Sequence, residues 1–213
     1  MPLPKVCGAR PDIGGYPRRW LACTASTNDA AREWAAAGAP DGVVLYARRQ
    51  TNGRGQRGRV WLSPPDLGLA VSFVLRPVDQ SAVRATEWAI LGAMAVHGAL
   101  QRAGISGLRV KWPNDILAHG KKICGILAEP RIQAGRIEFV ILGIGINLGQ
   151  REEDFPEELR AVATSCRMEG IASTAEQMID ALAVALGRIR GLPFGEVESA
   201  WRAVLTGAAP ALR

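Results

Sequence analysis

The residues best suited to chemistry lie in one basic stretch, from Ala47 to Trp61 (ARRQTNGRGQRGRVW). Glycines at every second or third position prevent a regular helix and let backbone amides approach a ligand closely. Its guanidinium groups can donate paired hydrogen bonds to a phosphate or carboxylate. The arginines are Arg48, Arg49, Arg54, Arg57 and Arg59. The stretch therefore predicts a mobile loop that closes over an anion.

Two other interpretations of this basic stretch stay open on the residues alone. A flexible, positively charged loop also suits sequence-independent contact with an RNA backbone. An ordinary solvated loop needs no ligand at all. The charge pattern by itself does not separate these three possibilities.

The composition limits the chemistry that the chain can perform. With 213 residues, of which 48% are hydrophobic, the chain is expected to form one domain with a substantial core. The net charge of +6 suits an acidic partner or a nucleotide without selecting one. Four cysteines without a CxxC pair, and only two histidines, argue against a zinc site and against histidine-based nucleophilic catalysis. We therefore expect chemistry that depends on charge and positioning.

The N-terminus has no signal-peptide pattern, and the chain has no long uninterrupted apolar run. A cytoplasmic protein without a membrane partner is expected, with its thiols reduced.

Apolar periodicity predicts strands with interposed helices, followed by a helical end, which indicates an α/β or α+β fold with a mixed sheet. Residues 1–17, rich in proline and glycine, are expected to form an irregular leader. A helix is expected from Ser26 or Thr27 to about Ala37, with Gly38 as its stop. The predicted strands are 20–23, 43–47, 67–75, 108–112, 115–118, 121–129 and 137–143, and the other predicted helices are 82–103, 156–163, 175–190 and 194–205.

A hairpin is predicted around the turn His119-Gly120. With a two-residue turn, Lys122 faces Leu117 and Cys124 faces Asp115, which brings Lys122 and Asp115 within diagonal reach on one face. An alternative is that Lys122 is only a charge on an edge strand. Farther along, Gly143-Ile144-Gly145-Ile146-Asn147 follows an apolar strand, and its alternating glycines indicate close approach of a backbone or a ligand.

Five motifs in this order resemble one family, the bacterial biotin protein ligases. The motifs are Ser26-Thr27-Asn28, Gln50 with the segment Gly53 to Trp61, Lys111-Trp112-Pro113-Asn114-Asp115, Lys122-Ile123-Cys124-Gly125-Ile126-Leu127, and Gly143 to Asn147. The resemblance implies an α+β fold, the biotin/lipoate ligase-like catalytic domain, with a mixed, mostly antiparallel sheet packed with helices. It also implies a single catalytic domain over residues 1–213, without the DNA-binding domain and the C-terminal β-barrel of other members.

The resemblance further implies a reaction, that of a biotin-[acetyl-CoA-carboxylase] ligase. Biotin and ATP, with Mg²⁺, give biotinyl-5'-AMP and pyrophosphate, and a lysine of a biotin carboxyl carrier protein then takes the biotinyl group. Such chemistry needs cations and positioning more than a protein nucleophile. No fixed metal site on the protein and no DNA partner are expected, and the protein is expected to be a monomer or a weak homodimer.

Site residues follow from the same resemblance. Lys122 and Arg54 are the expected catalytic residues. Biotin is expected to contact Ser26, Thr27, Asn28, Gln50, Gly53, Arg54, Gly55, Gln56, Lys122 and Gly125. ATP or the adenylate is expected to contact Arg54, Arg57, Trp61, Lys111, Asn114, Asp115 and Asn147.

One departure from the family pattern stands out, since Gln56 occupies a position where the family commonly has arginine. Loss of that cation predicts weaker retention of the adenylate, unless Arg57 compensates. Two alternatives remain. A lipoate or octanoate ligase or transferase shares the fold, but commonly has a different glycine-rich segment after its paired arginines. A non-catalytic RNA- or ligand-binding protein is the alternative from another class.

Overall fold

A computed structural model describes residues 9–13, 16–77 and 85–207, and the chain divides into two compact units. The expected single catalytic domain stays a prediction. The first unit comprises Met1–Trp88 and Leu127–Gly145, and the second comprises Ala89–Ile126 and Ile146–Arg213. Strands β7 (Lys121–Gln133) and β8 (Arg136–Asn147) each pass from one unit into the other. No sequence feature between the elements indicates this division.

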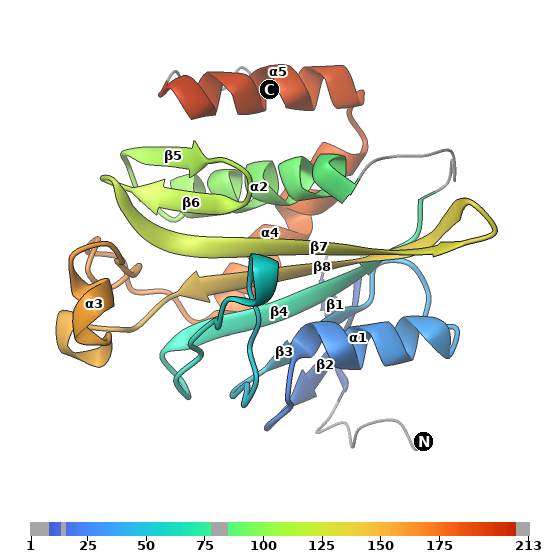
Figure 1. Cartoon of the computed structure of the whole chain (residues 1–213), viewed down its shortest axis with the longest axis horizontal. Helices are drawn as coiled ribbons and strands as arrows, with labels where there is room; N and C mark the ends of the chain where they lie inside the picture. The colour runs from blue at the N-terminus through green and yellow to red at the C-terminus, as the bar shows by residue number, and fades with distance from the viewer. Residues whose placement is uncertain (1–8, 14–15, 78–84, 208–213) are drawn as a thin grey trace. The chain divides into compact units, whose positions relative to one another are not determined.

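In the first unit the strands lie in the order β1-β2-β3-β4-β8-β7 (Figure 1). The remaining strands are β1 (Ala9–Ile13), β2 (Tyr16–Leu21), β3 (Val44–Ala47) and β4 (Gly68–Leu75). Strands β2 and β3 are parallel, whereas β1–β2 and β3–β4 are antiparallel. The predicted mixed, mostly antiparallel sheet is confirmed.

The prediction of an irregular leader is wrong for residues 9–13 and 16–17, which belong to β1 and β2, while residues 1–8 and 14–15 lie outside the described part. Strand β1 is at the edge of the sheet, where a proline such as Pro11 removes no hydrogen bond that a second neighbour needs. Strand β2 also starts earlier than the predicted residue 20 and ends at Leu21.

The second unit contains the strand order β7-β6-β5, with both pairs antiparallel. Its elements are α2 (Ala85–Arg102, whose first four residues lie in the first unit), β5 (Leu108–Lys111), β6 (Asp115–Ala118), the 3-10 helix η2 (Glu152–Asp154), α3 (Glu157–Arg160), α4 (Ala175–Arg190) and α5 (Phe194–Thr206). Helix α5 packs on β5 (Figure 1). Helix α4 matches its predicted bounds, α3 is shorter than predicted, and the predicted start of α2 at residue 82 lies outside the described residues. None of the helices in the described ranges has the length and apolarity to cross a membrane.

The hairpin of β6 and β7 contains a β-bulge that the sequence analysis missed. Leu117 pairs with Lys122 as predicted, but Ile116 pairs with Cys124 and Asp115 pairs with Gly125, so the predicted pairing of Cys124 with Asp115 is wrong. The extra residue, Ile123, is fully buried like its neighbour Cys124. Regular alternation would turn one of two adjacent residues toward the opposite face, and the bulge lets both be buried.

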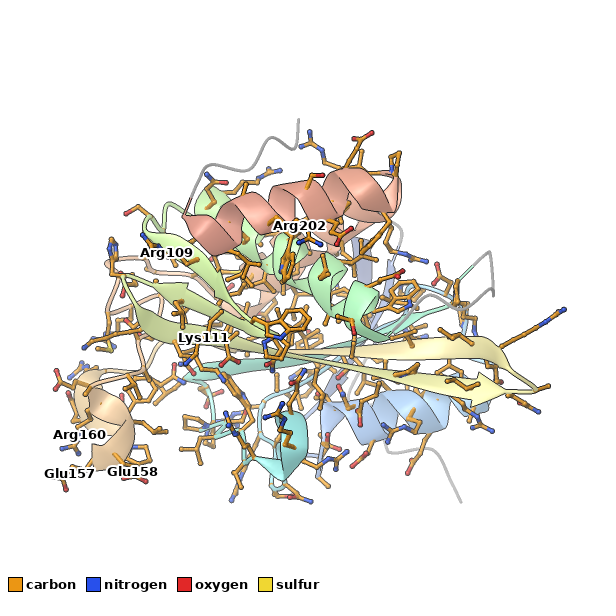
Figure 2. The ribbon with its side chains drawn as sticks, turned by 45° about the horizontal axis from the view of Figure 1, so that its top comes forward. Arg109, Lys111, Glu157, Glu158, Arg160 and Arg202 are labelled. Carbon is orange, nitrogen blue, oxygen red and sulfur yellow. The ribbon has the colours of Figure 1, made fainter. Side chains whose placement is uncertain are left out.

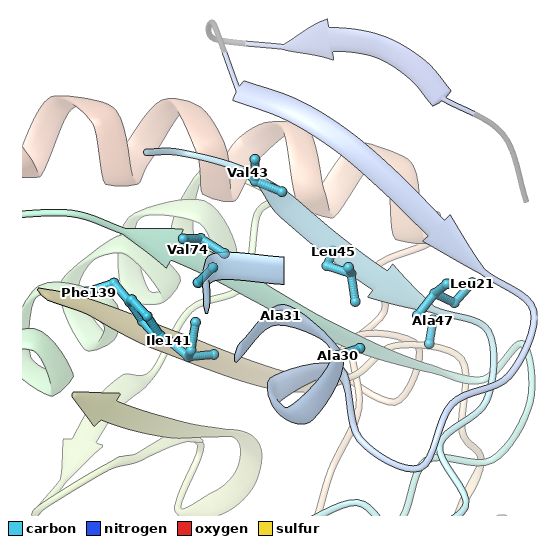
Figure 3. Packing of buried hydrophobic residues seen from close by; sticks show 10 residues of the cluster. Leu21, Ala30, Ala31, Val43, Leu45, Ala47, Val74, Phe139 and Ile141 are labelled. Carbon is cyan, nitrogen blue, oxygen red and sulfur yellow. The ribbon is translucent and has the colours of Figure 1, made fainter. Parts of the chain in front are cut away.

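Helix α1 (Thr27–Ala36) is held against the sheet of the first unit by alanines. Ala30, Ala31 and Ala35 are buried in one cluster with larger side chains of the strands, which include Leu45, Val74 and Ile141 (Figure 3). Because alanine is short, the helix backbone can lie close to the strands. The helix ends as predicted before Gly38, whose φ of 91° suits glycine. This packing fixes the first turn of α1, which carries Thr27 and Asn28.

Enlarging a buried alanine of α1 tests this packing. Ala31→Leu should reduce the free energy of unfolding by about 1–3 kcal/mol, because the added methyl groups have no space against the sheet. Urea denaturation measures the difference. Ala36→Leu is the matched control, since Ala36 is exposed on the same helix and its substitution should change stability by less than about 0.5 kcal/mol. Equal losses in both variants would contradict the packing described.

Candidate functional site

The first unit brings together a cluster of neutral polar side chains at the start of α1. The Oε1 atom of Gln50 accepts hydrogen bonds from the backbone N of Thr27 at 2.8 Å and from its hydroxyl at 3.1 Å. The hydroxyl of Ser72 on β4 lies 2.8 Å from Thr27 Oγ1 and 2.6 Å from Asn28 Oδ1. Thr27, Asn28 and Ser72 are buried, as is Ser26, whose side chain makes no capping hydrogen bond. The predicted set Ser26, Thr27, Asn28 and Gln50 therefore lies together.

Ser72 is a member of this cluster that the sequence analysis missed. It is fully buried in β4, a strand of otherwise apolar residues. A buried hydroxyl needs a hydrogen-bond partner, and on a strand buried on both faces that partner must come from a packed neighbour. One polar residue in the apolar run 67–75 was the available signal.

Glycines let neighbouring groups approach the backbone closely around this cluster. A Cβ atom on Gly143 would lie 2.2 Å from Asn28 Oδ1, and one on Gly145 would lie 2.3 Å from the indole of Trp61. A Cβ atom on Gly53 would lie 2.5 Å from the carbonyl oxygen of Trp61. Groups do approach Gly143 and Gly145 closely, but they are the side chains of Asn28 and Trp61, whereas the prediction named a backbone or a ligand.

The basic stretch folds back on itself as a small hairpin. Arg54 and Val60 form an antiparallel bridge, the N–H of Gly55 donates to the carbonyl of Arg59 at 2.7 Å, and that of Trp61 donates to Gly53 at 2.9 Å. The turn is the 3-10 helix η1 (Gln56–Gly58). The hairpin therefore has its own backbone hydrogen bonds, and its predicted mobility stays a prediction.

Two arginines of the stretch pair with acids from other segments. Arg54 donates two hydrogen bonds to the carboxylate of Asp29 on α1, at 2.6 and 2.5 Å, and Arg48 pairs with Asp66. The hydrogen bond from Arg54 is the main reason why the pKa of Asp29 lies below its ordinary value. By contrast, Arg57 and Arg59 are exposed and contact no acid within the described residues. The role of Asp29 could not be predicted from local sequence, because 25 residues separate it from Arg54.

The second unit holds the lysine that the sequence analysis singled out. The Nζ atom of Lys122 lies 2.8 Å from Asp115 Oδ1, which confirms the predicted proximity of the two side chains. The backbone of Lys122 is held on its other side, because its N–H donates to Val162 at 2.7 Å and its carbonyl accepts from Thr164 at 2.9 Å. The Lys122 side chain is 35% exposed, so its charge remains accessible to a ligand.

Two asparagines expected to contact ATP or the adenylate use their amides within the second unit. Asn147 donates to the carbonyl of Thr164 at 2.9 Å and accepts from Gln150 Nε2 at 3.2 Å. Asn114 donates to the carbonyl of Ile126 at 3.0 Å. In the structure both residues connect loops to strands, and their contact with adenine stays a prediction.

The remaining predicted residues of the second unit lie on the strands of the hairpin. Lys111 is exposed at the end of β5 and follows Arg109 along that strand (Figure 2). It is opposite Asp115 in the β5–β6 pairing, and Gly125 is opposite Asp115 in the β6–β7 pairing. Asp115 is therefore the common neighbour of the predicted residues on these strands.

The other titratable groups offer little alternative chemistry. His97 is buried in α2, and desolvation lowers its pKa. Burial raises the pKa of the Cys166 thiol to about 12 and raises that of Cys124 well above its ordinary value, so neither thiol forms a thiolate readily. Cys7 lies outside the described residues. In the part of the chain that the structure describes, no three histidine, cysteine or acidic side chains are grouped as metal ligands.

Comparison with known proteins identifies the class to which this architecture belongs. The model of the biotin/lipoate A/B protein ligase family matches residues 20–147. This match covers more than half of the chain. It includes the polar cluster around Thr27 and the pair of Lys122 and Asp115. The chain belongs to the biotin/lipoate A/B protein ligase family.

Two named relatives are similar to this chain over most of its length. The chain is 35% identical over 191 residues to the biotin–[acetyl-CoA-carboxylase] ligase of Paracoccus denitrificans, with 86% of this chain and 78% of that protein covered. It is 39% identical over 158 residues to the bifunctional ligase/repressor BirA of Bacillus spizizenii, with 74% of this chain and 48% of that protein covered. The chain thus spans about half the length of the Bacillus relatives that it matches.

Solved structures confirm the predicted fold. The structure of a biotin protein ligase from Aquifex aeolicus in complex with biotin and ATP matches with a TM-score of 0.70 and 30% identity, covering 86% of this chain and 76% of that one. The catalytic fold of biotin protein ligases is therefore the fold of this chain.

The Arg54–Asp29 pair gives a prediction for the pH dependence of stability. Because the pKa of Asp29 is lower in the folded than in the unfolded protein, the pair stabilises the fold above the ordinary carboxyl pKa of about 3.9. That contribution is lost as the pH falls through the folded-state pKa. The stability difference between wild type and Asp29→Asn, measured by urea denaturation, should be constant from about pH 5 to 8 and shrink below about pH 4. A difference that persists at low pH would contradict this assignment.

Proposed function

We propose that the protein is a biotin–[acetyl-CoA-carboxylase] ligase, which activates biotin with ATP and transfers it to a carrier protein. The observation that carries this proposal is the hydrogen-bonded cluster of buried Thr27, Asn28 and Ser72 with partly buried Gln50, whose side chains are all uncharged. A neutral ureido ring needs its few polar atoms matched in this way within an apolar pocket. The names of the Paracoccus and Aquifex relatives agree with biotin as the substrate.

In the first step of the proposed reaction, a carboxylate oxygen of biotin attacks the α-phosphorus of ATP. A new P–O bond forms between biotin and the α-phosphorus. The bond between the α-phosphorus and the oxygen that bridges to the β-phosphate breaks, and pyrophosphate leaves. Mg²⁺ would enter with ATP and leave with pyrophosphate. Negative charge gathers at the phosphorus during this step, so cations at fixed positions accelerate it. No side chain has to act as a nucleophile, which agrees with the high pKa values of Cys124 and Cys166.

Lys122 is the residue that we assign to charge stabilisation. The β-bulge at Ile123, the backbone hydrogen bonds to residues 162 and 164, and the ion pair with Asp115 together hold its ammonium group in one position. A fixed charge stabilises a transition state more than a mobile one, because no reorganisation is needed during the reaction. We assign Asp115 to orienting Lys122.

The basic hairpin is proposed to cover the carboxylate and the phosphate. We assign Gly53, Gly55 and Gln56 to the ligand, as the family resemblance implies, and exposed Arg57 can contribute charge. We assign Trp61 to stacking on adenine. The family resemblance also assigns Asn147, Asn114 and Lys111 to the adenylate and Gly125 to biotin. Gln56, in place of the family's usual arginine, is expected to reduce attraction for the adenylate.

The second step transfers the biotinyl group. The ε-amine of a lysine on a biotin carboxyl carrier protein attacks the acyl carbon, an amide bond forms, AMP leaves, and the lysine loses a proton. ATP and a carboxylase carrier are cytoplasmic, so we propose that the enzyme works there. The chemistry of this step requires a carrier that presents an exposed lysine on a folded domain.

Biotin-dependent exchange of radioactive pyrophosphate into ATP tests the proposal. Wild-type protein should catalyse the exchange, and Lys122→Ala should lower its rate by a factor of about 10²–10³, because the removed charge acts only in the transition state. The half-exposed side chain should be removable without unfolding, which circular dichroism checks.

Two comparisons make this experiment decisive. Lys121→Ala is the matched control, since it removes the adjacent lysine, and its rate should stay within about twofold of wild type. Octanoate and lipoate should not replace biotin. Exchange with octanoate but not biotin would favour the lipoate branch of the family, and no exchange with any acid by folded protein would contradict the proposed function.

A further inference from the structure

A chain of alternating charges connects the basic hairpin to the polar cluster, and all of its members belong to the first unit. Arg54 binds Asp29 through two hydrogen bonds at 2.6 and 2.5 Å. Asp29 also accepts a hydrogen bond from Arg32 at 3.0 Å, and Arg32 pairs with Glu129 at 2.9 Å. Glu129 accepts a hydrogen bond from Asn28 Nδ2 at 2.6 Å.

We propose that Asp29 is a positioning residue of the biotin site. Through Arg54 it braces the basic hairpin against α1, and it shares Arg32 with Glu129. The brace is this set of contacts among Arg54, Asp29, Arg32 and Glu129. This inference rests on the proposed function. It gives Arg54 a positioning role in place of the direct ligand contact that the family resemblance implies. Asp29 and Glu129 were not among the residues singled out from the sequence.

The geometry of the Arg54–Asp29 pair favours a brace over an incidental surface contact. Single exposed ion pairs contribute about 0–1 kcal/mol, but bidentate arginine–carboxylate pairs within a network are the exception. The side chains of Arg54 and Asp29 are 32% and 36% exposed, whereas those of Arg48 and Asp66 are 56% and 59% exposed. The two pairs therefore differ in solvent screening, and only the first belongs to a chain that reaches the polar cluster.

The brace affects the biotin-binding residues through Glu129. Its carboxylate accepts from Asn28 Nδ2, which directs the other end of that amide, Oδ1, toward Ser72. Gly143 leaves the space in which this amide lies. The charge chain thus fixes both the hairpin and the orientation of Asn28, so the site is organised before a ligand enters. A preorganised site avoids paying the ordering cost during binding.

Arg54 is also poorly placed to be the main anion-binding group of the hairpin. Both of its terminal nitrogens donate to Asp29, whose negative charge offsets its own. Arg57 and Arg59 contact no acid in the described residues, so their charges are available for a phosphate. A division of roles follows, in which Arg54 holds the hairpin and the two later arginines face the ligand.

Limited proteolysis with trypsin tests the brace without any need for activity. Trypsin cleaves after arginine, and Arg54, Arg57 and Arg59 lie in the hairpin. Asp29→Asn should make cleavage in this hairpin about fivefold faster or more in the ligand-free protein, because cleavage follows the population of the opened segment. Asp66→Asn is the matched control, since it removes the exposed pair of Arg48, and it should change the rate by less than about twofold.

Steady-state exchange kinetics provide the second measurement. Asp29→Asn should raise the KM for biotin about tenfold and change kcat less than about threefold, because the hairpin must be ordered when biotin binds. Combining Asp29→Asn with Arg54→Gln should be no worse than Asp29→Asn alone, since Arg54→Gln removes a pair that Asp29→Asn has already removed.

The outcomes separate this inference from the proposed function. If wild type catalyses biotin-dependent exchange but Asp29→Asn matches it in both cleavage rate and KM, the brace is refuted and the function stands. Additive effects in the double variant would also overturn the brace. If wild type shows no exchange, the proposed function fails, and the proteolysis result still decides whether Asp29 holds the hairpin.

Discussion

The polar atoms buried at the start of α1 must be hydrogen-bonded inside an apolar core, and this constraint governs the arrangement of the first unit. Ser72 from β4, Gln50 from the segment after β3 and Glu129 from β7 meet this need for Thr27 and Asn28. Because a buried unpaired amide or hydroxyl costs more than a hydrogen bond contributes, these contacts favour one arrangement of the four segments. The side chains of Thr27, Asn28, Gln50 and Ser72 are themselves uncharged, which suits the uncharged ring of the proposed ligand.

Electrostatics in the two units follow different patterns. In the first unit, acids distant in sequence offset Arg48 and Arg54, so the positive field of the hairpin comes from its later arginines. In the second unit, one lysine is fixed by a bulge, two backbone hydrogen bonds and one carboxylate. A lysine held at a fixed position is what the proposed ligase activity would use to stabilise developing negative charge, in a chain that has only two histidines.

Much of the fold could be predicted from local pattern. Helices α1 and α4, strands β3 and β4, and the proximity of Lys122 to Asp115 followed from periodicity, capping residues and turn chemistry. The bulge at Ile123 could not be predicted in this way, because two consecutive apolar residues on a strand indicate a bulge only when the faces of the sheet are known. Strand β1 was missed since its proline and polar residues are tolerated only at an edge. Ser72 alone carried a usable signal among the missed site residues, whereas Asp29 and Glu129 act through contacts between distant segments.

Equilibrium binding of biotin, measured by calorimetry without ATP, tests the central claim most directly. Wild-type protein should bind one biotin and should not bind octanoate measurably under the same conditions. Ser72→Ala should weaken biotin binding about three- to tenfold, because one hydrogen bond that fixes Thr27 and Asn28 is lost. Folded protein that binds no biotin, or binds biotin and octanoate equally, would contradict the account.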